Sequence, residues 1–302
     1  MKPSPLRAIV VPLDGSRLAE CALPIALSLL PPEGRLILVR VPEYTETQAP
    51  IGAEYNMFWP EVQNTSEMYN QVHKDIEDYL SHVAERCRRD DIIIDIEIGE
   101  GDRAAAIIEI AKNKAADMIL MTTHGRTGVS RWIIGSITER VLHDAPCPVL
   151  AVRSQSNCTP DRPAAQPLPN ILVTLDGSEL AEMALPPAMA VAHALGSRLQ
   201  LARVLPTAEQ SAADQPESDG YVEQIAADCR AEGIETTAVA LASSGSGAAS
   251  VASSILDYAV GNEISLIAMS THGRSGLQRW VYGSVTEKVL HNSEVALLVV
   301  RP

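Results

Sequence analysis

Residues 8–30 read AIVVPLDGSRLAECALPIALSLL, and residues 170–192 read NILVTLDGSELAEMALPPAMAVA. Each stretch begins with a continuous apolar run rich in β-branched residues, turns at Asp-Gly-Ser, and continues with apolar residues at helical spacing. This pattern predicts a buried strand, a turn and a helix that begins near Ser16. Pro24 is expected either to kink that helix or to end its first turn.

The repeat extends over the whole chain. Residues 123–143, THGRTGVSRWIIGSITERVLH, match residues 271–291, THGRSGLQRWVYGSVTEKVLH, at 14 of 21 positions. All matching segments occur in the same order, so the chain holds two copies of one domain rather than a series of short repeats. The stretch 154–169 has the Pro, Ser and Asn content of a linker. We therefore predict domains at 1–153 and 170–302.

Strand and helix patterns alternate along each copy, which implies a parallel sheet with right-handed crossovers. In the first copy further strands are expected at 35–41, 92–98, 117–122 and 147–153, with helices at 66–89, 103–114 and 137–144. The predicted fold is α/β, with two tandem doubly wound domains that are Rossmann-like. Each would be a five-stranded parallel sheet with helices on both faces, and ligands would bind at the carboxyl ends of the strands.

The composition narrows the class of protein. The formal net charge of −14 at pH 7 disfavours a general nucleic-acid binder, because neutralising phosphates needs clustered Lys and Arg. No apolar run approaches the ~20 residues that span a bilayer, so no membrane partner is expected. The five cysteines form no CxxC pair and no zinc spacing, and no apolar leader is expected after Met1. These features favour a cytoplasmic protein.

A Gly-bearing segment follows the fourth strand of each copy. Its residues are Gly125, Gly135 and Ser136 in the first copy and Gly273, Gly283 and Ser284 in the second. Glycine lets the backbone approach a ligand closely, and the helix that follows offers unpaired N–H groups that favour a phosphate. Alternatively, the Ser-x-x-Glu pattern is a capping box, and the glycines only shape a turn. The location at the carboxyl end of a strand favours phosphate binding.

Asp14 and Asp176 end the first strand of each copy. A carboxylate there can accept hydrogen bonds from a ribose or hold a metal, or it can bond the backbone of its own turn. Both interpretations stand at this point. His124 and His272 precede the glycines, and each could be a general base or a loop-packing residue. No Ser or Cys nucleophile arrangement favours the first role.

A second Gly-rich stretch, GEGDRA at 99–104, partly fits a dinucleotide-binding fingerprint. That fingerprint wants an acidic residue about 20 positions on, at the end of the next strand. Asp117 has roughly that spacing, but it begins a strand instead. This interpretation is therefore disfavoured.

Together these motifs resemble the universal stress protein family in its tandem-domain form. The resemblance covers nearly the whole chain and rests on VPLDGS, on His-Gly-x9-Gly-Ser with a Thr-Glu-x-Val-Leu helix, and on a last strand of the PVLAVR type. Nucleotide-binding members of the family carry Gly-x2-Gly-x9-Gly followed by Ser or Thr. Both later glycines of that motif are present in each copy, whereas Thr122 and Ser270 replace the first.

The resemblance implies a role for several residues. Asp14 and Asp176 would contact the ribose, and the backbones of Val41 and Val204 would meet the adenine. Pro12 would lie beside the base, and Thr174 takes that place in the second copy. Arg126 and Arg274, which follow the glycines, are expected to stabilise the charge of a bound phosphate. Domains of the family pair through the last strand, so a tandem chain is similar to a dimer built in one piece; a homodimer of whole chains is a further expectation.

These observations favour a stress-response or signalling protein that binds ATP or a related adenine nucleotide, with Mg²⁺ or Mn²⁺ as the candidate divalent ion. The alternative is an interaction protein of the same fold with one or both sites empty, because Thr122 and Ser270 depart from the motif. No catalytic residue is predicted. ATP hydrolysis would at most be slow, since no arginine finger or water-positioning residue is evident.

Overall fold

The computed structural model describes residues 4–42, 61–123, 134–153, 168–205, 208–243, 245, 247–271 and 283–301, with only the backbone for 61–66 and 208–219. The first half of the chain comprises β1 (Ala8–Pro12), α1 (Arg17–Glu20), α2 (Leu23–Leu29), β2 (Arg35–Arg40), α3 (Glu61–Arg86), β3 (Ile93–Ile98), α4 (Arg103–Asn113), β4 (Met118–Thr122), α5 (Ser136–Asp144) and β5 (Val149–Val152). The second half comprises β6 (Asn170–Leu175), α6 (Glu179–Glu182), α7 (Leu185–Leu195), β7 (Arg198–Leu205), α8 (Ala208–Ala231), β8 (Thr236–Ala242), α9 (Ala248–Gly261), β9 (Leu266–Ser270), α10 (Ser284–Asn292) and β10 (Ala296–Val300).

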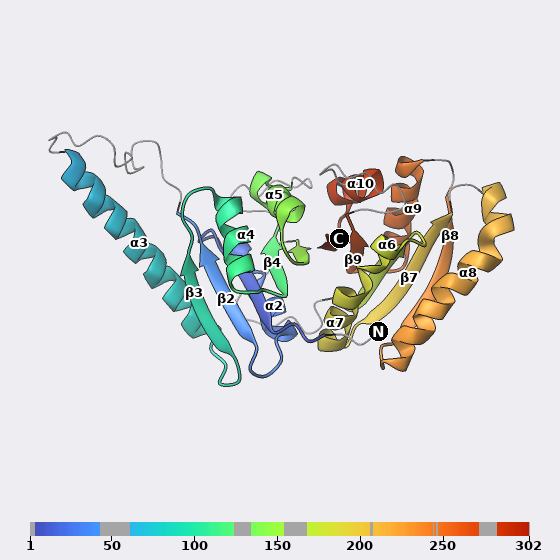
Figure 1. The fold of residues 1–302 in the computed structure, drawn as a ribbon, viewed down its shortest axis with the longest axis horizontal. Coiled ribbons are helices and arrows are strands. Elements are labelled where there is room, and N and C mark those ends of the chain that lie inside the picture. The colour runs from blue at the N-terminus through green and yellow to red at the C-terminus, as the bar shows by residue number, and fades with distance from the viewer. Residues whose placement is uncertain are drawn as a thin grey trace.

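All ten strands form one continuous sheet in the order β3-β2-β1-β4-β5-β10-β9-β6-β7-β8. Within each half the neighbouring strands are parallel, and the two halves meet where β5 pairs antiparallel with β10. Figure 1 shows the halves side by side, with α3 and α8 at the two far ends. The predicted fold class, two doubly wound five-stranded parallel sheets in tandem, is therefore confirmed.

Apolar side chains on both faces of the strands explain why helices cover both faces. On β1, Ile9 and Val11 pack with the helices α1, α2 and α3, whereas Val10 points to the opposite face and packs with α4 and α5. Strands buried on both sides are expected to be continuously apolar, as these are. Each of the two cores contains residues from both halves of the chain, so hydrophobic packing continues across the boundary between them.

The boundary between the halves is held by main-chain and side-chain contacts. Leu298 on β10 lies opposite Leu150 on β5, and both side chains are completely buried. Beside the strands α2 packs against α7, and Arg153 Nη1 donates to the carbonyl oxygen of Glu294 at 3.3 Å. Residues 154–167 of the predicted linker lie outside the described residues.

The first predicted helix differs from the structure in one respect. It begins where expected, because the Ser16 hydroxyl accepts a hydrogen bond from the Ala19 N–H and caps α1. However, α1 ends at Glu20, and a second helix, α2, starts at Leu23. Pro24 lies in the first turn of α2, where its missing N–H would have no helical partner anyway. The proline thus opens a new helix instead of kinking one.

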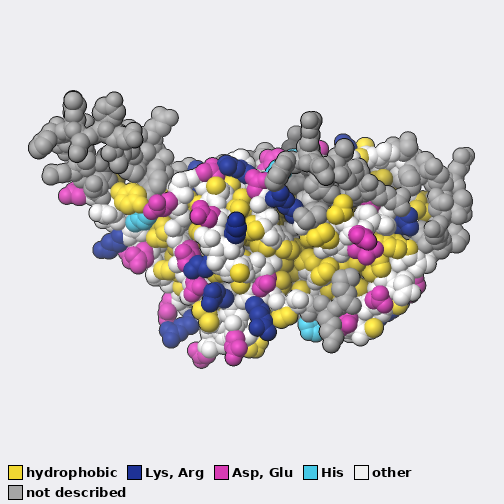
Figure 2. Space-filling model, in the orientation of Figure 1, with side chains coloured by type: hydrophobic (Ala, Val, Ile, Leu, Met, Phe, Trp, Pro, Cys, Tyr) yellow, Lys and Arg dark blue, Asp and Glu magenta, His cyan; other side chains and the backbone are white. Residues whose placement is uncertain are grey.

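The described surface carries charges of both signs. On the face shown in Figure 2, Lys and Arg side chains alternate with Asp and Glu, most clearly over the first half. None of the helices in the described ranges is long and apolar enough to cross a membrane. Cys87, Cys147 and Cys229 are free thiols, whereas Cys21 is disulfide-bonded.

We predict that Leu298→Ala destabilises the protein by about 2–5 kcal/mol, because the substitution leaves a cavity where the two halves meet. Urea denaturation followed by circular dichroism measures the free energy of unfolding. The control is Val260→Ala, at a position with 73% exposure, which should change that free energy little. Equal stability of the two variants would contradict a packed boundary.

Candidate functional site

The strand order reverses direction at one point in each half. β1 lies between β2 and β4, and β6 lies between β7 and β9. The chain leaves β1 toward α1 on one face of the sheet and reaches α5 on the other face after β4. In doubly wound folds this reversal of direction opens a crevice at the carboxyl ends of the strands. The described members of the predicted site lie at the strand and helix ends around this point.

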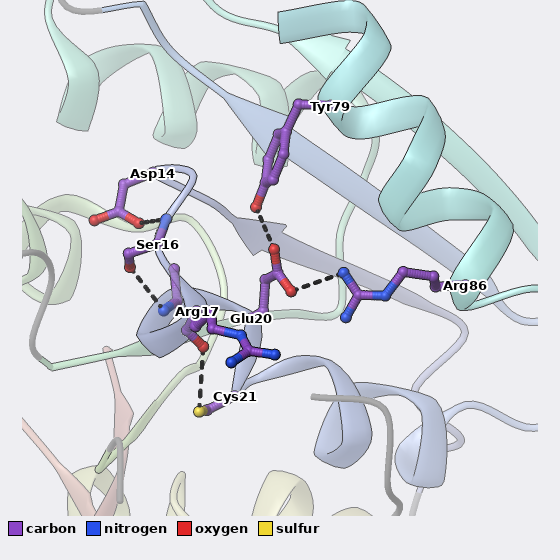
Figure 3. Close-up of polar contacts among 8 residues, drawn as sticks. Asp14, Ser16, Arg17, Glu20, Cys21, Tyr79 and Arg86 are labelled. Carbon is purple, nitrogen blue, oxygen red and sulfur yellow. Dashed lines mark hydrogen bonds and ion pairs between the residues drawn. The ribbon is translucent and has the colours of Figure 1, made fainter. Parts of the chain in front are cut away.

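The aspartates after β1 and β6 hold the backbone of their own turns. Asp14 Oδ1 accepts from the Ser16 N–H at 2.8 Å, and Asp176 Oδ1 accepts from the Ser178 N–H at 3.0 Å (Figure 3 shows the first pair). The turn role considered for these residues is therefore confirmed. Asp176 Oδ1 also accepts from the Ser178 hydroxyl at 2.6 Å. The turn role and a ligand role are compatible, because an ionised carboxylate has about four acceptor positions.

The helices α5 and α10 begin one residue earlier than a capping box requires. Gly135 and Gly283 occupy the N-cap positions, and neither helix has a side-chain cap bond. Ser136 and Ser284 are the first helical residues, so the capping-box interpretation of these serines is wrong. The helix start is tied to the preceding strand instead, since Thr138 Oγ1 donates to the Thr122 carbonyl at 3.5 Å and Thr286 Oγ1 to the Ser270 carbonyl at 3.0 Å.

The second half contains a cavity of about 280 Å³ at this place. It is lined by Thr174, Leu175, Asp176, Ala181, Val204, Val251, Ile255, Met269, Ser270, Gly283, Ser284, Val285 and Thr286. The structure thus brings together the predicted residues Thr174, Asp176, Val204, Ser270, Gly283 and Ser284. Small-molecule sites are commonly such crevices, with apolar walls and a few polar groups.

One hydroxyl in this cavity wall lacks a partner. Ser270, the last residue of β9, is 7% exposed, and its buried Oγ makes no hydrogen bond within the described part of the chain. Buried polar groups are nearly always hydrogen-bonded, so such an exception calls for an explanation. The described residues contain one other, Ser197 Oγ, which does not line the cavity. A polar ligand in the cavity would be a partner for the Ser270 hydroxyl.

The predicted residues of the first half occupy the matching places. Pro12 ends β1 and Asp14 follows it, Val41 comes directly after β2, and Thr122 ends β4. Gly135 and Ser136 begin α5 as their counterparts begin α10. Gly125, Arg126, Gly273 and Arg274, as well as His124 and His272, lie outside the described residues.

Several wall residues were missed from the sequence. Val251 and Ile255 stand four positions apart on α9 and face the cavity together with Met269. Their i, i+4 spacing is the signal of an apolar helix face, but that signal is the same for ordinary core packing. Thr286 was also missed, although its place two residues after Ser284 recurs in the first copy as Thr138.

The contacts in the stretch GEGDRA disfavour a phosphate site there. The Asp102 carboxylate caps α4 by accepting from the Ala105 N–H at 2.9 Å, and it also pairs with Arg140 at 2.8 Å. These two contacts hold the pKa of Asp102 below its usual range, so a negative charge already occupies this helix start. A pyrophosphate would be repelled there.

A protein-only metal site is absent from the described ranges, which contain no group of three or more His, Cys, Asp or Glu side chains placed to hold an ion. Mg²⁺ often binds through one or two carboxylates together with substrate phosphates. Asp14 and Asp176 each supply one carboxylate of the kind that such a phosphate-bound ion uses.

The universal stress protein family model matches this chain twice, over residues 5–153 and 168–301. A universal stress protein of Mycobacterium tuberculosis is 26% identical over 204 residues, which is 65% of this chain and 64% of the relative. Another from Methanocaldococcus jannaschii is 48% identical over 60 residues, 20% of this chain and 35% of that protein. The matched stretches therefore span less than two thirds of these relatives.

Solved structures of similar shape are also known. The crystal structure of a universal stress protein from Archaeoglobus fulgidus superimposes with a TM-score of 0.69, at 20% identity and 98% coverage of both chains. A protein of unknown function from Pseudomonas aeruginosa gives 0.62 at 16% identity, covering 98% of this chain and 93% of that one. At these identities the likeness establishes the fold.

We predict different effects for alanine at the two N-cap glycines. A Cβ at Gly283 would lie 3.1 Å from the Thr271 carbonyl oxygen, which already accepts the Gly283 N–H at 2.7 Å, whereas a Cβ at Gly135 would lie 3.9 Å from the Thr123 oxygen. Gly283→Ala should destabilise the protein by about 1 kcal/mol, and Gly135→Ala by much less. Thermal unfolding measures both, and an equal shift in Tm would contradict the tighter contact in the second half.

Proposed function

Because the chain belongs to the universal stress protein family, a family of stress-response proteins, we propose that it binds ATP or a related adenine nucleotide at the carboxyl ends of its strands. The observation that supports this proposal best is the cavity in the second half. Six of the predicted site residues line it, and the Ser270 hydroxyl in its wall has no partner in the described part of the protein.

Each wall of this cavity suits a different part of a nucleotide. Val204, Val251 and Met269 offer apolar surface for the adenine. Asp176 supplies an acceptor for ribose hydroxyls. The start of α10 at Gly283 and Ser284 supplies N–H groups and the positive end of a helix dipole for phosphate.

In the first half, the corresponding site would use Asp14 for the ribose, Val41 for the adenine and Ser136 for phosphate. Thr122 takes the place of Ser270, and Pro12 the place of Thr174. Gly125 and Gly273, with the arginines Arg126 and Arg274 that follow them, would complete the phosphate contacts. A Mg²⁺ or Mn²⁺ ion would be held mainly by the phosphates and would neutralise part of their charge.

A second candidate function is an interaction protein with one or both sites empty. It is favoured by Thr122 and Ser270, whose side chains occupy positions where nucleotide-binding members of the family carry glycine. Thr122 is 8% exposed, so its methyl and hydroxyl groups fill space next to the site. We propose binding rather than turnover for either function, with ATP hydrolysis at most slow.

The setting of the protein is also a proposal. We propose a cytoplasmic protein, because the free thiols of Cys87, Cys147 and Cys229 fit a reducing compartment. The disulfide at Cys21 is instead typical of an oxidising compartment. The two halves already pair within one chain through β5 and β10, and a homodimer of whole chains would add a second level of association.

We expect denatured, freshly purified protein to release about two adenine nucleotides per chain, one for each half, as measured by mass spectrometry. About one per chain would indicate that the copies have diverged in affinity. No released nucleotide, followed by no heat in a calorimetric titration with ATP, would contradict nucleotide binding and favour the interaction protein.

We expect Asp176→Asn to weaken ATP binding at the second site by about tenfold or more, the range for a hydrogen bond to a charged group. Asparagine keeps one side-chain oxygen that accepts from Ser178, so the turn is retained. It has no second oxygen to accept from the ribose. The control is Asp102→Asn, which removes a carboxylate from the other Gly-rich stretch and should leave binding unchanged. Equal affinity of wild type and Asp176→Asn would contradict the assigned contact.

A further inference from the structure

Three side chains in the first half form a connected polar cluster beneath the turn that bears Asp14. The Tyr79 hydroxyl on α3 donates to Glu20 Oε1 at 3.0 Å, and Arg86 Nη1 donates to Glu20 Oε2 at 2.9 Å (Figure 3). Glu20 is 6% exposed, and these bonds satisfy both of its oxygens. Burial and the Glu20 carboxylate raise the pKa of Tyr79 well above its usual value, so its hydroxyl remains a donor.

Arg40 connects this cluster to the site. It is the last residue of β2, directly before Val41, and its guanidinium carbon lies 4.8 Å from the centre of the Tyr79 ring. A Cβ added at Gly15 would lie 3.0 Å from Arg40 Nη2, so the same guanidinium group is packed against the turn. Gly15 has φ +83°, a conformation that other residues rarely adopt.

The same arrangement recurs in the second half. Arg203 lies over the Tyr221 ring at 5.5 Å, and the Tyr221 hydroxyl donates to Glu182 Oε1 at 2.8 Å. Gly177 has φ +84°. Asp228 occupies the place of Arg86, so the Glu182 carboxylate has no arginine at that position.

We propose that Tyr79 and Arg40 are positioning residues for ligand binding at Asp14. The Glu20 carboxylate holds the tyrosine ring in place, and the ring holds the Arg40 guanidinium group. That group in turn holds the backbone of the Gly15 turn in its position. Since Asp14 Oδ1 is bonded to the Ser16 N–H of that turn, any shift of the turn moves the carboxylate. This inference rests on the proposed function, in which Asp14 contacts a nucleotide.

The test compares two tyrosines of one helix. Tyr79→Phe removes the bond to Glu20, and the matched control Tyr69→Phe removes a hydroxyl bond of the same length, 3.0 Å, from α3 to Glu100. Both are made in an Asp176→Asn background, so that an ATP titration reports the first site. We expect Tyr79→Phe to weaken ATP binding about threefold to tenfold, the effect of one lost hydrogen bond, and Tyr69→Phe to leave it unchanged. Unchanged affinity in Tyr79→Phe would overturn the proposal.

Hydrogen exchange separates this proposal from the proposed function. We expect the Ser16 amide to exchange faster in Tyr79→Phe, and also in Arg40→Lys, which keeps the charge but loses the planar group that stacks on the ring. Tyr69→Phe should exchange like wild type. If the wild-type protein takes up no ATP, nucleotide binding fails, and exchange alone decides the positioning role: equal exchange in all variants refutes it.

Discussion

The antiparallel pairing of β5 with β10 is the constraint on which the rest of the structure depends. A parallel sheet ends in an unpaired strand that is buried on both faces, and such an edge exposes apolar side chains and free backbone groups. In this chain Leu150 and Leu298 would stand at those edges, yet both are completely buried because each edge covers the other. Covalent linkage makes this pairing intramolecular, so it needs no second chain.

The pattern that builds the sheet also determines where a site can form. The interiors of the central strands β1, β4, β6 and β9 are filled by apolar side chains that pack against helices on both faces. On the central strands β4 and β9, polar residues appear where the strands end, at Thr122 and Ser270. Because neighbouring parallel strands end on the same side, these residues meet those from the turn after β1 or β6. The direction of the strands therefore determines at which edge of the sheet a site can form, whichever residues stand there.

This explains which features were predictable from the sequence. Continuous apolar runs identified the strands, and their alternation with helical patterns gave the layers. Of the cavity residues, Asp176, Gly283 and Ser284 followed from their places at strand and helix ends. Thr174, Val204 and Ser270 came from the family resemblance. Pro24 was expected either to kink the first helix or to end its first turn, because a proline in a helical pattern fits both. The structure has the break, with α1 ending at Glu20 and α2 starting at Leu23. The contact of Arg40 with Tyr79 could not be predicted, since it joins a strand to a distant helix and leaves no local pattern. The role of Ser136 depended on a shift of one residue, which only the backbone geometry resolves.

The two copies retain one architecture but differ in the groups next to each site. Thr174 and Ser270 bring two hydroxyls to the second cavity, where the first half has the ring of Pro12 and the side chain of Thr122. A proline adds no donor and limits the backbone, whereas a hydroxyl whose partner is missing favours a polar ligand. The second cavity thus has more hydroxyl groups in its wall than the matching positions of the first half supply. In the first half, Arg86 adds a further bond to the Glu20 carboxylate, so an additional protein contact holds the cluster of Glu20 and Tyr79 in place.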